Sequence, residues 1–303
     1  MKLLWLDLNS SYAHSSLALP ALHAQIADDT TIEWCIVSAT INENTGMVVS
    51  RIHKHRPDII AATNWLFNHE QLLHIISRAK ALLPHCCIVL GGPEFLGNNE
   101  AFLYKNKFVS GVFRGEGEEV FPQWLKVWNH SKETWKSITG LCYLDENGRY
   151  QDNGIARVMN FSQLVSPEKS CFFNWSKPFV QLETTRGCFN TCAFCVSGGE
   201  KPVRTIPLEA IRERLNDIHQ HGIKNVRVLD RTFNYNNKRA KELLDLFRQY
   251  PDICFHLEIH PALLSEELKQ ELSVLPKGLL HLEAGIQSLK ESVLQQSRRI
   301  GKL

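Results

Sequence analysis

The chain has 303 residues, of which 44% are hydrophobic and 22% are charged, and its formal net charge is +2. These values are typical of a globular protein of about two domains. The small net charge excludes a general electrostatic attraction to nucleic acid or to a membrane surface. No apolar run approaches the roughly 18 residues that a membrane-spanning helix needs. We therefore expect a cytoplasmic protein without a nucleic-acid or membrane partner.

The first part of the chain alternates short apolar runs with segments of helical periodicity. Strands are predicted at 3–6, 32–37, 58–62, 87–90 and 108–113, and helices near 16–26, 45–55, 69–83 and 118–128. Apolar strands that alternate with helices are typical of a parallel sheet covered on both faces. We therefore expect a doubly wound, Rossmann-like α/β domain over residues 1–130. Its ligands should bind at the carboxyl ends of the strands.

The pattern changes after residue 130. Residues 134–160 read as a hairpin that turns at Asp145–Gly148, and residues 160–178 have no clear period. A hairpin and linker are therefore expected over 131–178. From residue 179 the alternation of strand and helix resumes, with strands near 179–184, 224–229, 253–259 and 279–286. Four βα units are thus predicted over 179–303.

Nine cysteines are present, and three of them stand close together as Cys188, Cys192 and Cys195. Their C-x3-C-x2-C spacing lies on a loop directly after a predicted strand, where Gly187 allows a sharp turn. Three thiolates so placed can bind three irons of a 4Fe–4S cluster, which leaves the fourth iron open to chelate an amino acid. Phe194 is then expected to pack beside the cluster or its ligand. The other cysteines are scattered, which does not resemble a secreted disulfide framework.

Other readings of the cysteine loop remain open. A structural zinc site needs a fourth ligand, which would have to be the remote Cys254, His256 or His260. A ferredoxin-type site needs a fourth cysteine nearby, and none closely follows Cys195. Three buried free thiols are a further alternative, although the loop is polar.

The cysteine motif resembles the signature of the radical S-adenosylmethionine (SAM) superfamily, and the first domain resembles the cobalamin-binding domain that often precedes it. Further segments carry the resemblance: 91–94 (GGPE), 114–118 (RGEGE), 138–141 (ITGL), 230–233 (DRTF) and 283–288 (EAGIQS). The likeness extends over most of the chain. Each glycine-containing segment is a weak signal by itself, whereas the cysteine motif in order with the others is specific.

The resemblance implies a radical SAM barrel, here incomplete, with a 4Fe–4S cluster and SAM at the carboxyl ends of its strands. By position, Asp230, Glu258 and Gln287 are the candidate SAM contacts. Gly91, Gly92, Gly115 and Glu116 are the candidate cobalamin contacts. An electron donor of the flavodoxin or ferredoxin type is also implied. Alternatively, Asp230 caps the next loop, Glu258 pairs with Arg227, and Glu283 is an ion-pair partner inside the barrel.

Three features depart from the family pattern. Gly198-Gly199-Glu200 imitates a SAM-binding triad but follows Cys195 too closely, so it is expected to be a plain loop. The Asp-x-His-x-x-Gly motif, which supplies a histidine to cobalt, is absent; His14 is the nearest substitute, and cobalamin is expected to bind without a protein histidine. The family continues for two more βα units, so a chain that ends at 298–303 is expected to be a fragment of doubtful activity.

The leading hypothesis is an enzyme that cleaves SAM reductively and modifies an unactivated carbon of a small molecule, with methyl transfer as one outcome. A non-catalytic remnant that binds a corrinoid or cluster, and a zinc-stabilised binding protein, are the alternatives. The sequence identifies neither the substrate nor a catalytic residue.

Overall fold

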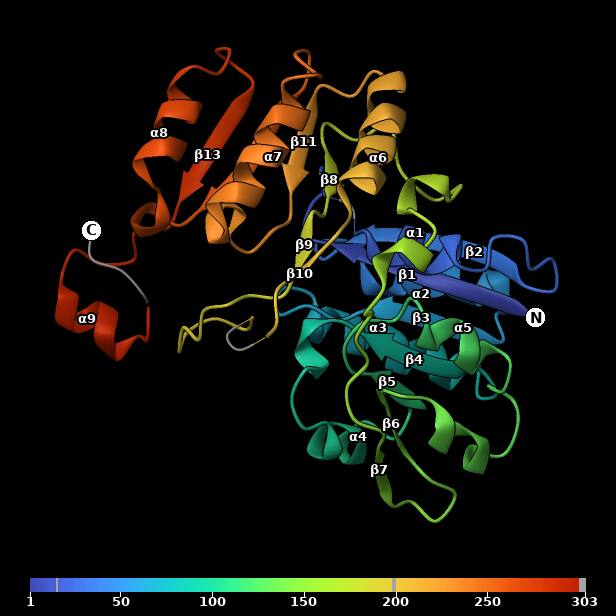
Figure 1. Cartoon of the computed structure of the whole chain (residues 1–303). Coiled ribbons are helices and arrows are strands. Elements are labelled where there is room, and N and C mark those ends of the chain that lie inside the picture. The colour runs from blue at the N-terminus through green and yellow to red at the C-terminus, as the bar shows by residue number, and fades with distance from the viewer. Residues whose placement is uncertain (15, 198–199, 300–303) are drawn as a thin grey trace. The chain divides into compact units, whose positions relative to one another are not determined.

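The computed structural model describes residues 1–14, 16–197 and 200–299 (Figure 1). The chain divides into two compact units. The first unit comprises Met1–Asn160 and Leu164–Phe173, and the second comprises Phe161–Gln163 and Asn174–Leu303. Among the residues that the structure describes, no helix has the length and apolar character needed to cross a bilayer.

The first unit is built on a seven-stranded sheet of order β2-β1-β3-β4-β5-β6-β7 (Figure 1). Its five parallel strands are β1 (Lys2–Asn9), β2 (Glu33–Thr40), β3 (Ile59–Thr63), β4 (Cys87–Gly91) and β5 (Gly111–Phe113). The antiparallel hairpin of β6 (Leu141–Leu144) and β7 (Tyr150–Asp152) extends this sheet. The order β2-β1-β3 reverses direction at β1, which is the arrangement of a doubly wound sheet.

Helices cover both faces of this sheet. They are α1 (Ala18–Ala24), α2 (Thr45–His55), α3 (His69–Leu82), α4 (Glu100–Lys105) and α5 (Val120–Leu125), with single 3₁₀ turns η1 (Pro93–Phe95), η2 (Lys132–Ser137) and η4 (Pro167–Lys169). Side chains of β1 alternate between two cores. Leu4 and Leu6 belong to the core that includes Ile52 of α2, whereas Leu3 belongs to the core that includes Trp124 of α5. The predicted doubly wound fold is therefore confirmed.

The second unit contains a four-stranded parallel sheet of order β13-β12-β11-β8. Its strands are β8 (Val180–Leu182), β11 (Asn225–Val228), β12 (Cys254–Ile259) and β13 (Leu280–Ala284). They alternate with α6 (Leu208–Gln220), α7 (Asn237–Phe247), α8 (Glu266–Ser273) and α9 (Glu291–Gln296), while η3 (Phe161–Gln163), η5 (Phe233–Tyr235) and η6 (Pro261–Leu263) are single 3₁₀ turns. The four predicted βα units of an incomplete barrel are confirmed.

The two faces of the second sheet differ in character. Val226 and Val228 of β11 and Leu257 of β12 are buried on one face, together with apolar side chains of α6 and α7 such as Leu215 and Leu243. The other face is polar. Residues in register on neighbouring strands share a face of the sheet. The polar face carries Gln181, Arg227, His256, Glu258, His281 and Glu283.

Candidate functional site

The cysteine loop, residues 187–203, begins and ends at a narrow neck in the second unit. The antiparallel strands β9 (Thr185–Arg186) and β10 (Arg204–Thr205) form this neck, and the backbone N–H of Cys188 donates to the carbonyl of Glu200 at 3.0 Å. Gly187 has a φ of +94°, and a Cβ added there would stand 2.5 Å from the Glu200 oxygen. The expected sharp turn at Gly187 is therefore present, and the neck requires a glycine.

The three cysteines differ in exposure. Cys188 and Cys192 are buried, at 8% and 6% exposed, whereas Cys195 is exposed. Burial raises the pKa of the Cys188 thiol above its usual value, the backbone N–H of Asn190 opposes this rise, and the nearby Cys195 and Cys192 add to it. The thiols are thus close enough to influence one another. In the described ranges, however, no three His, Cys, Asp or Glu side chains converge on a metal position, so cluster ligation stays a prediction.

The donor set of the loop suits an iron–sulfur cluster better than zinc. A cluster with one open iron needs only the three soft thiols of this loop, whereas a structural zinc site needs a fourth ligand. The side-chain oxygen of Asn190, a residue only 3% exposed, is buried without a hydrogen-bond partner. A buried acceptor of this kind is costly unless a donor satisfies it. Gly198 and Gly199 lie outside the described residues, so the loop expected there is not placed.

Asp230, a candidate SAM contact by its position in the sequence, is buried in the structure. Asp230 follows β11 and is 1% exposed. Its carboxylate accepts hydrogen bonds from the backbone N–H groups of Thr184 and Thr185, at 2.8 and 2.9 Å, and from the Thr184 hydroxyl. Burial raises the pKa of Asp230, and the hydrogen bonds from Thr184 and Thr185 oppose that rise. The carboxylate therefore faces the chain itself, close to the neck of the cysteine loop.

Glu258 lies on the polar face of the second sheet. Its carboxylate is 3.7 Å from the guanidinium of Arg227, as the ion-pair alternative expects. Glu283 is 3.5 Å from the same guanidinium and 2.8 Å from Nε2 of His256. The His256 ring in turn stacks on His281, with ring centroids 4.7 Å apart. Two carboxylates and a histidine thus gather around one guanidinium on this face.

Phe194 and Gln287 are both exposed, Phe194 at 57%. Their expected contacts with the cluster or SAM stay predictions. Arg299, which the sequence analysis does not single out, lies beside Cys192. One nitrogen of its guanidinium is 4.0 Å from Sγ of Cys192, and another donates to the Gly285 carbonyl at 2.6 Å. A cation beside the loop would favour a bound anionic group. The only sequence signal for it was the adjacent pair of arginines after the last helix.

The backbone packs closely around two of the glycines predicted to contact cobalamin, Gly92 and Gly115, and their contact with cobalamin stays a prediction. Gly92 has a φ of +110°, and a Cβ there would stand 2.5 Å from the Asn64 carbonyl oxygen. A Cβ on Gly115 would collide with the backbone of Ala156. Glu116 accepts a hydrogen bond from the N–H of Val158 at 2.9 Å. Gly91 faces more open space, since its added Cβ would lie 4.0 Å from the nearest atom, in Phe113.

The loop after β3 presents an apolar tip at the carboxyl edge of the first sheet. Leu66 is 82% exposed. The residues before and after it, Trp65 and Phe67, stack their rings on each other. Asn68, which is 1% exposed, holds this loop: its side chain donates to the Leu8 and Thr63 carbonyls and accepts from the N–H of Trp65. The tip is therefore firmly supported although it is exposed.

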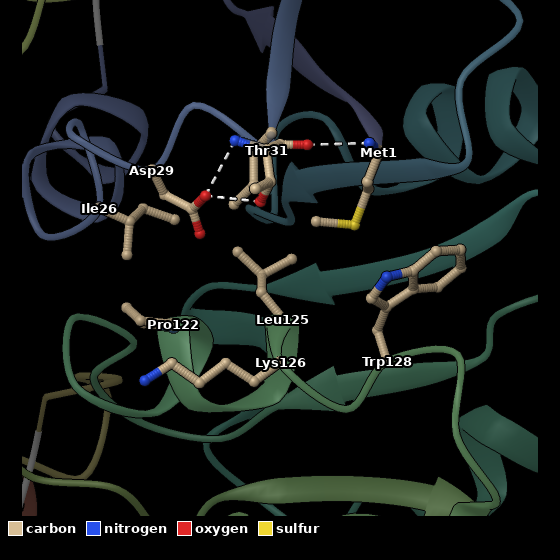
Figure 2. Close-up of a pocket in the computed structure, with 9 residues that line it drawn as sticks. Met1, Ile26, Asp29, Thr31, Pro122, Leu125, Lys126 and Trp128 are labelled. Carbon is tan, nitrogen blue, oxygen red and sulfur yellow. Dashed lines mark hydrogen bonds between the residues drawn. The ribbon is translucent and has the colours of Figure 1, made fainter.

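A pocket of about 380 Å³ lies at the opposite edge of this sheet, near the first residues of β1 and β2 (Figure 2). Asp29 binds Thr31 at its rim, and the Met1 ammonium donates to the Thr31 carbonyl at 2.9 Å. Lys126 and Trp128 lie across from them. Ligands of doubly wound sheets bind at the carboxyl ends of the strands. This pocket is thus on the edge that such ligands do not use.

Comparisons with known proteins match both units. Residues 8–125 match the family model of the B12 binding domain, and residues 182–303 match that of the radical SAM superfamily. The chain carries a B12-binding domain followed by a radical SAM domain.

It is 29% identical over 201 residues to an uncharacterized methyltransferase, PH0819, of Pyrococcus horikoshii, covering 63% of this chain and 43% of that protein. It is 20% identical to the cobalamin-dependent radical SAM methyltransferase TokK of Streptomyces tokunonensis, over 58% of this chain and 28% of TokK.

Solved structures show the same succession of folds. The methyltransferase TsrM of Kitasatospora setae, with tryptophan and a SAM analogue bound, has a TM-score of 0.74 at 14% identity, over 99% of this chain and 63% of TsrM. The cobalamin-dependent enzyme OxsB, with aqua-cobalamin and SAM bound, has a TM-score of 0.77 at 18% identity, over 99% of this chain and 46% of OxsB. The chain thus spans less than two thirds of each of these proteins.

In the B12-binding domain, His14 lies in the loop after β1. It is exposed, and its Nδ1 is 2.7 Å from the Ser10 hydroxyl. This contact engages the imidazole within its own loop. The radical SAM domain begins at β8 and includes the cysteine loop, Asp230 and the polar face. Ile300–Leu303, part of the tail that was expected to mark a fragment, lie outside the described residues.

Proposed function

We propose that this chain forms part of a cobalamin-dependent radical SAM methyltransferase. The observation that carries the proposal is the cysteine loop, which emerges directly from the first strand of the radical SAM domain and is closed at its neck. Cys188, Cys192 and Cys195 bind the 4Fe–4S cluster. When bound, the cluster and cobalamin supply the electron and the methyl carrier for reductive SAM cleavage and methylation of an unactivated carbon.

The residues of the chain have distinct tasks in this proposal. Cys188 and Cys192 would bind the cluster from buried positions, and Cys195 from an exposed one. Arg299, beside Cys192, attracts the carboxylate of SAM. The buried oxygen of Asn190 is available to a donor such as the SAM amino group. Phe194 has the exposed apolar ring that could cover an adenine once SAM is bound.

In the B12-binding domain, the carboxyl edge of the sheet is proposed to bind cobalamin. Gly91 offers open backbone there, and Leu66 offers an apolar surface. Gly92, Gly115 and Glu116 support this edge through their contacts with Asn64, Ala156 and Val158. Cobalamin is proposed to bind without a protein histidine on cobalt, because the sequence lacks the Asp-x-His-x-x-Gly motif.

The substrate is proposed to be a small molecule, and the electron donor a flavodoxin or ferredoxin. Several relatives are named as methyltransferases, among them a hopanoid C-3 methylase of Methylococcus capsulatus. All nine cysteines are free thiols, which suits the reducing cytoplasm. These statements rest on relatives that share only part of their length with this chain.

Anaerobic reconstitution with iron and sulfide tests the proposal. The purified chain should bind about four irons and show the broad absorption of a 4Fe–4S cluster. The triple variant Cys188→Ala, Cys192→Ala, Cys195→Ala should bind none, whereas Cys171→Ala, which removes an exposed cysteine of the first unit, should bind iron normally. One zinc and no iron would contradict the proposal and support a zinc-stabilised binding protein.

A second stage separates an enzyme from a non-catalytic remnant. The loaded chain is given SAM, cobalamin and a chemical reductant, and the products are separated by chromatography. Formation of 5′-deoxyadenosine or S-adenosylhomocysteine supports the enzyme. A complete cluster with neither product supports a chain that binds the cofactors without turnover.

A further inference from the structure

Thr184 directly precedes β9, and its contacts fix both strands of the cysteine-loop neck. Its backbone N–H and hydroxyl both donate to the carboxylate of Asp230. Its carbonyl accepts from the N–H of Ile206, the residue after β10, at 2.9 Å. Thr184 is fully buried, and the neighbouring Thr185 gives Asp230 a further N–H bond at 2.9 Å. The orientation of the loop therefore depends on where Asp230 holds Thr184.

The segment after β11 thus holds the base of the cysteine loop through Asp230. Since Asp230 is 1% exposed, it presents no free surface to a ligand.

We propose that Asp230 is a positioning residue that orients the cysteine loop for cluster binding through Thr184 and Thr185, and that it does not contact SAM. This inference rests on the proposed function, because it assumes that the loop binds a cluster. It explains why a carboxylate is buried here at a cost in desolvation. Carboxylate oxygens accept several backbone N–H bonds at once, and such charge-assisted bonds are stronger than neutral ones.

Asn234 provides a matched control on the same segment. It is also 1% exposed, and its amide makes reciprocal hydrogen bonds with the backbone of His260, at 2.9 and 2.8 Å. It therefore fixes the segment to the end of β12 and away from the cysteine-loop neck. A loss of Asn234 should lower stability without changing the orientation of the cysteines.

The experiment compares Asp230→Ala, Asp230→Asn, Thr184→Val and Asn234→Ala in the full chain after anaerobic reconstitution. The measurements are the rate of iron loss to a chelator and the electron paramagnetic resonance spectrum of the reduced cluster. Asp230→Ala should lose iron at least about tenfold faster, because it removes three hydrogen bonds and one bond to a charged group alone corresponds to about that factor, and its spectrum should change. Asp230→Asn should be close to wild type, because the amide oxygen accepts the N–H bonds and the Thr184 hydroxyl can accept from its nitrogen. Thr184→Val should fall between them.

The inference is overturned if Asp230→Ala retains the wild-type iron-loss rate and spectrum, or if Asn234→Ala reproduces its effect. If Asp230→Ala does not fold, Thr184→Val is compared with Asn234→Ala by the same iron-loss rate and spectrum. The inference is then overturned if Thr184→Val matches wild type or if Asn234→Ala reproduces its effect. A wild-type chain that binds no iron would instead contradict the proposed function. In that case the alkylation rates of Cys188 and Cys192 in the metal-free variants still test the positioning role, since a released loop should react faster.

Discussion

The backbone N–H of Cys188 and the carbonyl of Glu200 are 3.0 Å apart, and this hydrogen bond brings the start of the cysteine loop against its end. Gly187 makes the approach possible because it has no side chain. The neck therefore fixes where the first cysteine enters the loop before any metal binds. A substitution at Gly187 should disturb this entry first.

Gly187→Ala is expected to weaken iron binding markedly, because its Cβ would stand 2.5 Å from the Glu200 oxygen and would force the neck apart. Gly222→Ala is the matched control: its φ is also positive, at +71°, but no atom lies within 4 Å of the added Cβ. The control should cost only about 1–2 kcal/mol of stability, the usual cost of a left-handed backbone. Iron per chain and urea unfolding measure the two effects. Equal iron binding by both variants would show that the neck has no such role.

Thiol alkylation should follow burial in the metal-free chain. Cys171 and Cys195 are exposed and should react with iodoacetamide first. Cys86 should be among the last, because burial raises the pKa of its thiol to about 12 and leaves little thiolate at neutral pH. Mass spectrometry of timed samples gives the order. After cluster reconstitution, Cys195 should become protected while Cys171 stays reactive; protection of both, or of neither, would argue against ligation by Cys195.

The stability of the first unit should decrease as the pH falls below about 7, and His23 is expected to contribute to this decrease. Burial lowers the pKa of His23 below its ordinary value of 6.5; the ring lies edge-on to Trp34 and Phe172 and is bonded to the Ser170 hydroxyl. The unfolded chain therefore takes up a proton at a higher pH than the folded chain, so stability is present above 6.5 and is lost as the pH falls toward the lower folded value.

Urea unfolding between about pH 5 and 8 measures this effect. The variant His23→Gln should show a flatter dependence of the unfolding free energy on pH. His53→Gln, which removes a histidine from the exposed side of α2, serves as the control. An unchanged slope in His23→Gln would contradict the assignment.

Asn68→Ala should destabilise the B12-binding domain by about 3 kcal/mol, because it leaves the Leu8 and Thr63 carbonyls and the Trp65 N–H without their buried partner. Asn98→Ala is the control: Asn98 is exposed, and its side chain bonds the N–H of Glu100. That change should cost less than about 1 kcal/mol. Thermal unfolding of both variants compares them, and equal losses would show that Asn68 does not support the loop.

The sequence predicted the strands well because apolar runs of this length bounded by turn residues are a local signal. The exceptions are short elements. The helix α4 was not predicted, since its six residues are too few to show a period, and only Leu103 among them is buried. The strand β5 begins at Gly111, later than expected, because the chain turns between Asn106 and Val109. The second hairpin strand ends at Asp152, earlier than expected.

The candidate site was predictable where its chemistry is local. The spacing of Cys188, Cys192 and Cys195 is visible in the sequence, and so is the need for Gly187. The burial of Asp230 was not, because it depends on a contact with Thr184, which lies 46 residues earlier. The close approach of Gly92 to the distant backbone of Asn64 was not visible either. Contacts between remote segments determine both features, and one sequence does not record them.

The antiparallel hairpin has a mechanical consequence for the carboxyl edge of the first sheet. Because β6 runs against β5, the loop after β5 is held on two sides: the N–H of Arg114 donates to Gly140, and that of Glu116 donates to Ala156. The backbone of this part of the edge is therefore held in place on both sides. Any adjustment to the shape of a bound molecule must then come from elsewhere along the edge, such as the loop after β1 in which Tyr12 is 74% exposed.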